Sequence, residues 1–184
     1  MSPNEFDAVP CLTTALQGPL HHLEEYLLKS QAKIENWFRQ QWRNTPAPVY
    51  ASVDLRNAGF KLAPVDTNLF PAGFNNLNPD FLPLCVQAAQ ATFDKLMPGC
   101  LRILLIPESH TRNMFYFESL ARLQEILLKA GYEVRIGSLL EEIGDEKIFD
   151  LPSGKTIKLE KIVREGNRIG VKNFSACFIL LNND

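Results

Sequence analysis

The stretch LRILLIPESHTRNMFYFESLARLQEILLKAGYEVRI, residues 101–136, decides the fold class of this chain. It begins with a near-continuous apolar run, as expected of a strand buried on both faces, and a polar turn follows at residues 107–113. Apolar residues at three- and four-residue steps then predict a helix over about residues 114–130, and Gly131 ends it. Residues 132–136 form the next strand, so the stretch predicts a right-handed, parallel βαβ unit.

Further strands are predicted toward the C-terminus. Residues 176–181 form another apolar run, and we expect its polar end to lie beside the end of the first strand, at the edge where α/β proteins bind ligands. Short alternating runs at residues 147–151, 156–163 and 168–171 predict a meander that hangs beyond the edge of the sheet. The sequence has neither a GxGxxG nor a GxxxxGK[ST] motif, which disfavours a dinucleotide-binding fold and a P-loop.

Two helices are predicted before the first strand. The first covers about residues 19–43, starts at Gly18-Pro19 and carries a stripe with two tryptophans. This aromatic stripe has three interpretations: part of a core, an interface with a second copy of the chain, or a platform for a ligand. The second helix covers about residues 78–97, with Asn78 or Asp80 as its cap and Pro83 in its first turn.

The segment from Ser52 to Asn76 concentrates polar and turn-forming residues without helical periodicity. Guanidinium groups bind carboxylates in a bidentate manner, and carboxylates and amides accept hydrogen bonds from an ammonium group, so an amino acid is a suitable ligand. The alternative is an irregular surface loop whose asparagines and glycines only form turns and whose first acid pairs with the nearby arginine. The candidate substrate-binding residues in this segment are Asp54, Arg56, Asp66, Asn68, Asn75 and Asn76.

A second polar cluster follows the first strand of the βαβ unit. Arg112 and Asn113 are candidate substrate-binding residues, while Ser109 is predicted to cap the helix. Lys61, Glu108 and His110 are predicted to support the substrate-binding residues without contacting the substrate themselves. No spacing of serine, cysteine, histidine and aspartate indicates a hydrolase, so no catalytic residue is assigned.

Composition limits the location and the partners of the chain. Its 184 residues are 46% hydrophobic with a net charge of −2 and a pI near 6.0, which disfavours nucleic-acid binding. No apolar run is long enough to cross a membrane and the N-terminus does not resemble a signal peptide, so a cytoplasmic location without membrane contact is expected. The adjacent His21 and His22 cannot form an i, i+4 ligand pair, and no metal site is predicted. Buried free thiols are predicted for Cys11, Cys85, Cys100 and Cys177.

Two long motifs carry a resemblance to a known family. DLRNAGFKLAPVDTNLFPAGFNNL at residues 54–77 and ILLIPESHTRNMFY at residues 103–116 resemble the proteobacterial glutamate-cysteine ligases, which are similar in plan to ATP-grasp ligases such as glutathione synthetase. The resemblance extends from about Val49 onward and implies that ATP drives the joining of the glutamate side-chain carboxylate to the cysteine amine. Members of that family run well beyond position 184, so the chain is expected to be an N-terminal portion.

The resemblance and the residue patterns together define the expected architecture. We expect a helical extension at residues 1–48 and a three-layer, parallel-sheet α/β substrate domain of the pre-ATP-grasp kind at residues 49–184. ATP and Mg²⁺ are expected to bind mainly outside this chain, which would be inactive by itself. A homodimer through the N-terminal helix is a further expectation. Two alternatives remain: a non-catalytic module that senses an amino acid, and an assembly domain built around the tryptophan-bearing helix.

Overall fold

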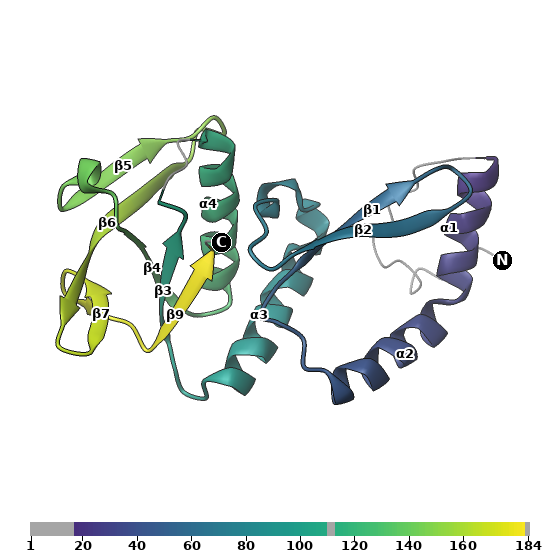
Figure 1. Cartoon of the computed structure of the whole chain (residues 1–184), viewed down its shortest axis with the longest axis horizontal. Coiled ribbons are helices and arrows are strands. Elements are labelled where there is room, and N and C mark those ends of the chain that lie inside the picture. Colours follow the sequence, from purple (N-terminus) through teal and green to yellow (C-terminus); the bar gives the residue numbers. More distant parts are fainter. Residues whose placement is uncertain (1–16, 110–112, 183–184) are drawn as a thin grey trace. The chain divides into compact units, whose positions relative to one another are not determined.

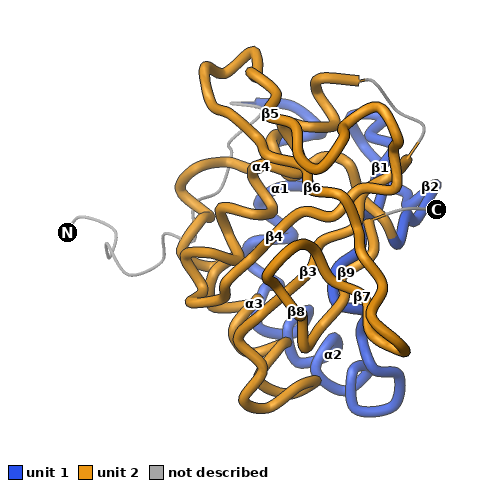
Figure 2. The backbone as a smooth tube through the Cα atoms, turned by 90° about the vertical axis from the view of Figure 1, so that its left-hand side faces the viewer, with its two compact units in different colours: residues 1–69 blue, residues 70–184 orange. Residues whose placement is uncertain are grey.

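The structure is a computed structural model, and it describes residues 17–109 and 113–182. The chain has two compact units, residues 1–69 and 70–184 (Figure 2). The predicted division into a helical extension at residues 1–48 and an α/β domain at residues 49–184 stays a prediction.

Two helices begin the first unit, α1 (Pro19–Lys29) and α2 (Gln31–Asn44). Pro19 occupies the first helical position as predicted, because its missing N–H would have no partner there. The prediction of one continuous helix was wrong, since Ser30 (φ −95°, ψ 0°) leaves helical geometry and separates the two. Thr45 is extended and precedes Pro46, which disfavours a helical residue before it and so ends α2.

The aromatic stripe of α2 does not form a core. Trp37 is 55% exposed and Trp42 is 52% exposed. The Phe38 ring lies between them in sequence and stacks on the Trp42 ring, with their centroids 5.7 Å apart. Of the three interpretations, packing into a core is therefore wrong for these side chains.

A β-hairpin completes the first unit: β1 (Ser52–Asn57) pairs antiparallel with β2 (Leu62–Asn68). The alternative of an irregular surface loop was wrong for these residues, because the alternating apolar residues favour paired strands and Asn57-Ala58-Gly59 favours a tight turn. Gly59 has a positive φ of 86°, and its N–H donates to Oδ1 of Asn57. A bulge lies opposite the step from Asp54 to Leu55, and Pro64 is tolerated beside it.

The second unit is a mixed α/β structure with a seven-stranded sheet (Figure 1). The strand order is β8-β7-β6-β4-β3-β9, with β5 paired to β6. Its elements are η1 (Phe74–Asn76), η2 (Pro79–Phe81), α3 (Leu82–Leu96), β3 (Arg102–Pro107), α4 (Met114–Lys129), β4 (Glu133–Ser138), η3 (Glu141–Ile143), β5 (Glu146–Asp150), β6 (Thr156–Glu165), β7 (Arg168–Val171), β8 (Phe174–Ser175) and β9 (Phe178–Asn182).

The predicted parallel strands are confirmed, and the predicted place of the meander is wrong. Strand β3 pairs parallel with β4 on one side and with β9 on the other. Strand β6 does not hang beyond the sheet, because it pairs parallel with β4 and extends the sheet. The remaining meander strands, β5, β7 and β8, pair antiparallel.

The sheet curls, and its central strand is covered on both faces. Neighbouring residues of a strand point to opposite faces. Leu104 and Ile106 of β3 pack with Val171 and Phe174 of the meander on one face. Next to β3, on β9, the Phe178 ring meets the Phe93 ring of α3 edge-on at 4.9 Å. The central run was predicted as buried on both faces, and this is confirmed.

Cys100 and Cys177 form a disulfide, with Cα atoms 5.8 Å apart, so the prediction of free thiols at these positions was wrong. The physical reason is the parallel pairing of β3 and β9, which places the residues before each strand side by side although they are 77 residues apart in sequence. Cys85 is a free, half-buried thiol, as predicted, and Cys11 lies outside the described residues.

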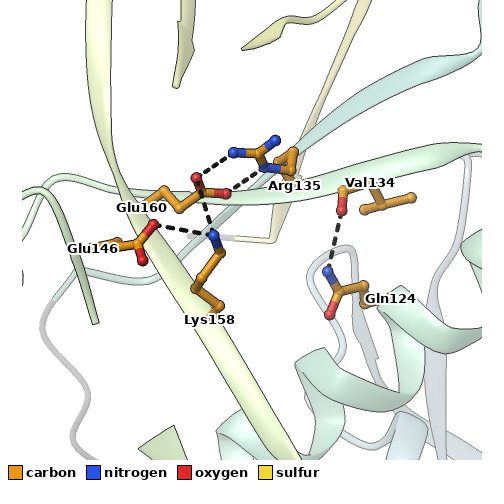
Figure 3. A network of polar contacts seen from close by, with 6 residues as sticks. All are labelled: Gln124, Val134, Arg135, Glu146, Lys158 and Glu160. Carbon is orange, nitrogen blue, oxygen red and sulfur yellow. Dashed lines mark hydrogen bonds and ion pairs between the residues drawn. The ribbon is translucent and has the colours of Figure 1, made fainter. Parts of the chain in front are cut away.

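A polar network crosses the curled part of the sheet (Figure 3). The guanidinium group of Arg135 on β4 donates two hydrogen bonds to the carboxylate of Glu160 on β6. Lys158 lies 3.6 Å from the same carboxylate and 3.1 Å from that of Glu146. The Glu160 side chain is only 6% exposed, so these contacts compensate for the burial of its charge.

Within residues 17–109 and 113–182, none of the helices has both the length and the hydropathy to cross a membrane. Nor do three or more histidine, cysteine or acidic side chains in this part of the chain gather in a way that could hold a metal ion.

Candidate functional site

A cleft of about 240 Å³ lies in the second unit, beside the start of α4. It is lined by Ala72, Asn75, Asn76, Asn113, Phe115 and Tyr116, and we call it the asparagine cleft. Three of the predicted substrate-binding residues therefore come together: the neighbours Asn75 and Asn76, and Asn113, which is distant from them in sequence.

Tyr116 fixes the first turn of α4 to the carboxyl edge of the sheet. Its hydroxyl group donates to the backbone carbonyl of Asn182, at 2.7 Å, and accepts from the N–H of Glu108, at 2.9 Å. Asn182 ends β9 and pairs with Pro107, the last residue of β3. The predicted meeting of these two strand ends is confirmed, and the asparagine cleft lies at the edge where ligands of α/β proteins usually bind.

The other wall of the cleft is held by two hydrogen bonds. The side-chain amide of Asn182 donates to the carbonyl of Pro71 at 3.2 Å. The N–H of Phe74 donates to the hydroxyl of Ser119, a side chain of α4 that is 1% exposed. Because these bonds attach Pro71 and Phe74, the first residue of η1, to β9 and α4, they position Asn75 and Asn76 beside the cleft.

The lining of the cleft is neutral and rich in amide groups. The Asn75 amide donates to the Asn76 carbonyl at 3.3 Å, and Asn113 caps α4 by accepting from the N–H of Phe115 at 2.9 Å. The Phe115 side chain is 66% exposed and adds an apolar wall. Amides donate and accept hydrogen bonds, so the cleft can bind carboxylate, amine or amide groups of a small ligand.

Four more predicted residues share one face of the hairpin in the first unit. Asp54 pairs directly with Asp66 across the two strands. Arg56 is two residues from Asp54, and Asn68 is two residues from Asp66, so strand alternation places all four on the same face. Two facing carboxylates repel each other unless a cation lies near, and Arg56 is the next residue on that face. The predicted common pocket of this face with the asparagine cleft stays a prediction.

The remaining predicted residues have mixed outcomes. Arg112 and His110 lie outside the described residues, so their roles stay predictions. Glu108 lies beside the cleft through its backbone hydrogen bond to Tyr116. Lys61 is exposed in the hairpin turn, where its carbonyl accepts from Ala58. The prediction that Ser109 caps α4 was wrong, because the helix starts five residues later, after Asn113.

The sequence analysis did not identify the residues whose hydrogen bonds hold the walls of the cleft in place, Tyr116 and Ser119. Tyr116 is the last residue of the motif at residues 103–116, and Ser119 lies outside both motifs. The available signal was chemical: a tyrosine or serine on the buried side of an amphipathic helix needs a hydrogen-bond partner.

Comparison with known proteins gives the family. The family model for glutamate-cysteine ligase matches residues 24–184, which is most of the chain. The chain belongs to the glutamate-cysteine ligase family. The resemblance drawn from the two sequence motifs is thereby confirmed.

A solved structure agrees with this family. The crystal structure from Methylobacillus flagellatus KT of a protein described as "Putative gamma-glutamylcysteine synthetase" is 59% identical in sequence, with a TM-score of 0.80. The match covers 96% of this chain and 42% of that protein, so the chain spans less than half the length of this solved relative. No curated protein matches the chain.

Proposed function

We propose that this chain supplies the substrate-binding half of a glutamate-cysteine ligase that makes gamma-glutamylcysteine, the first step of glutathione synthesis. The observation that carries the proposal is the convergence of Asn75, Asn76 and Asn113 in one cleft at the carboxyl edge of the sheet. The family match and the name of the solved relative support the reaction. The three-layer, pre-ATP-grasp arrangement and the cytoplasmic location belong to the same proposal.

The chain's own residues would bind and orient the amino-acid substrates. Arg56 can hold a substrate carboxylate through its planar fork, and Asp54 or Asp66 can hold an ammonium group. The asparagine cleft would fix the polar end of glutamate or cysteine through its amides. Such positioning brings the glutamate side-chain carboxylate and the cysteine amine into reacting geometry.

We propose that the carboxylate is activated as an acyl phosphate before the amine attacks it. The described residues do not fit a Mg²⁺–ATP site: they contain no metal-binding group of three or more His, Cys, Asp or Glu side chains, and the sequence has no P-loop. ATP and Mg²⁺ would therefore bind mainly outside this chain, and the chain alone would have no ligase activity.

Two substitutions in a full-length ligase carrying this chain test the proposal. Asn113→Ser keeps an N-cap for α4, since serine also caps helices, but removes the amide from the cleft. Arg56→Lys keeps the charge but removes the planar fork. We expect either substitution to raise KM for glutamate or cysteine about tenfold or more, the value of one charge-assisted hydrogen bond, with an unchanged far-UV circular dichroism spectrum.

The matched control is Arg39→Lys, the same change on the exposed surface of α2. It should leave both KM values unchanged. Steady-state kinetics in which Asn113→Ser and Arg56→Lys also leave both values unchanged would remove the residue-level case for substrate binding. If only Asn113→Ser raises KM, the substrate binds in the cleft and not on the hairpin. If only Arg56→Lys raises KM, the substrate binds on the hairpin and not in the cleft.

We further propose a homodimer formed through α2. Trp37 and Trp42 are exposed, and buried tryptophans contribute strongly to protein interfaces. Trp42→Glu is expected to weaken the dimer about thirtyfold or more, corresponding to about 2 kcal/mol for an interface tryptophan, whereas the neighbouring Gln41→Glu should have little effect. Sedimentation equilibrium measures this difference. A chain that stays monomeric at all accessible concentrations would contradict the dimer.

A further inference from the structure

A second, larger cavity lies in the curled part of the sheet. Its volume is about 420 Å³, within the usual size range of small-molecule sites. It is lined by the start of β3, the end of β6, and β7 with the turn and strand that follow. Val171 and Phe174, which are 2% and 5% exposed, are among its lining residues, so a rigid apolar wall supports it.

The lining carries three charged side chains, Arg102, Glu165 and Arg168. Within residues 17–109 and 113–182, neither guanidinium group makes a hydrogen bond or an ion pair. Glu165 on β6 and Arg168 on β7 lie directly opposite each other in the paired strands. Their side chains, both within the described residues, form no ion pair with each other. All three charged side chains are exposed to solvent, so the cavity presents two positive charges and one carboxylate to a ligand.

This cavity is distinct from the asparagine cleft. Arg102 is the first residue of β3, whereas the cleft lies at the opposite end of that strand, through the bonds of Tyr116 to Glu108 and Asn182. Six strand residues span about 17 Å. One small molecule cannot touch both places, so a ligand of this cavity is a separate ligand.

We propose that the cavity binds a dicarboxylic α-amino acid. Such a molecule has two carboxylates, which match the two guanidinium groups, and one ammonium group, which matches Glu165. A diphosphate would place its negative charge beside Glu165, and a monocarboxylate would leave one guanidinium group without a partner. Asn173 and Ser175 add polar side chains to the lining. This inference does not rest on the proposed function, because it uses no residue of the asparagine cleft or the hairpin.

The test is a titration of the ¹⁵N-labelled 184-residue chain with L-glutamate and L-aspartate. Amide chemical shifts measured by NMR at each ligand concentration report binding. We expect saturable shifts at Ile169, Gly170 and Asn173, which line the cavity. Arg168→Ala should weaken binding about tenfold or more, since it removes a charge-assisted contact. The matched control Lys172→Ala removes the same charge from an exposed neighbour outside the lining and should bind like the parent chain.

Related probes test the assigned chemistry. Glutarate lacks the ammonium group and should bind more weakly than glutamate to the parent chain, and Glu165→Gln should abolish that preference. If the amide spectrum shows that Arg168→Ala is unfolded, Arg168→Lys takes its place. Lysine keeps the positive charge but lacks the planar guanidinium group, so this variant should also weaken binding.

Three results would overturn the proposal: no saturable shift at the cavity, equal weakening by Arg168→Ala and Lys172→Ala, or tighter binding of inorganic pyrophosphate than of glutamate. Shifts confined to Asn75, Asn76 and Phe115 would also overturn it, while supporting substrate binding in the asparagine cleft. Conversely, failure of Asn113→Ser to change KM would leave this inference intact, so the two proposals fail separately.

Discussion

Replacing Cys100 with serine is expected to lower the free energy of unfolding of the unit 70–184 by about 4 kcal/mol. The disulfide to Cys177 closes a loop of 77 residues, and the chain-entropy model assigns about this value to a loop of that length. Without the cross-link, the starts of β3 and β9 are held by strand pairing and by the backbone hydrogen bond that the N–H of Cys177 donates to the carbonyl of Arg102.

Urea unfolding followed by far-UV circular dichroism measures this loss. Both tryptophans, Trp37 and Trp42, belong to the unit 1–69, so their fluorescence reports that unit and serves as an internal control. Cys85→Ser is the matched substitution at a free thiol and should cost about 1 kcal/mol. A reductant should lower the urea midpoint of the parent chain but not that of Cys100→Ser. An unchanged midpoint on reduction would show that the disulfide does not stabilise this unit.

Glu160→Gln is expected to destabilise the same unit by about 3 kcal/mol at neutral pH. The substitution leaves the guanidinium group of Arg135 beside a neutral, buried partner. Removing the charge of one partner from a buried ion pair typically costs about 3 kcal/mol or more. Glu146→Gln is the matched control, because Glu146 contacts the same Lys158 but is 54% exposed. Exposed pairs of this kind contribute less than about 1 kcal/mol.

The same carboxylate predicts a pH dependence of stability. Hydrogen bonds from Arg135 hold the pKa of Glu160 below its ordinary value of 4.5, and burial opposes this shift only in part. A group whose folded pKa is depressed contributes stability above its unfolded pKa, and this contribution is lost as the pH falls through the folded pKa. The parent chain should therefore lose stability progressively below about pH 4.5, and Glu160→Gln should lose less over that range. If the parent chain and Glu160→Gln lose the same free energy of unfolding across that pH range, the acid sensitivity belongs to other groups.

The strands and helices around β3 could be predicted because their sequence patterns are local. A continuous apolar run at residues 101–106 and a three- to four-residue repeat at 114–130 have one simple structural meaning each. The hairpin at residues 52–68 was not predicted, because its many polar and turn-forming residues are also typical of a loop, and its apolar alternation rests mainly on Val53, Leu55 and Val65. Likewise, Ser30 carries no strong break signal, so a long helix was predicted where two occur.

The candidate site could be predicted only as a set of residue types. Asn75, Asn76 and Asn113 are candidates because they are polar residues near predicted turns, and all three lie in the two motifs that carry the family resemblance. Their meeting in one cleft depends on Tyr116, Ser119 and Asn182, which hold distant segments together by hydrogen bonds between 2.7 and 3.2 Å. The sequence shows that a buried tyrosine or serine needs a hydrogen-bond partner, but it does not show which distant residue supplies that partner.

What the sequence by itself determined is the class of the fold, the parallel arrangement of β3, β4 and β9, and the family. Local periodicity and two long motifs suffice for these, because they depend on neighbouring residues. The tertiary structure alone decided the disulfide between Cys100 and Cys177, the buried pair of Arg135 and Glu160, the curl that forms the second cavity, and the asparagine cleft. Each of these joins residues that are far apart along the chain. Their proximity follows from strand order and register, which are set by the packing of the whole sheet and not by any local pattern.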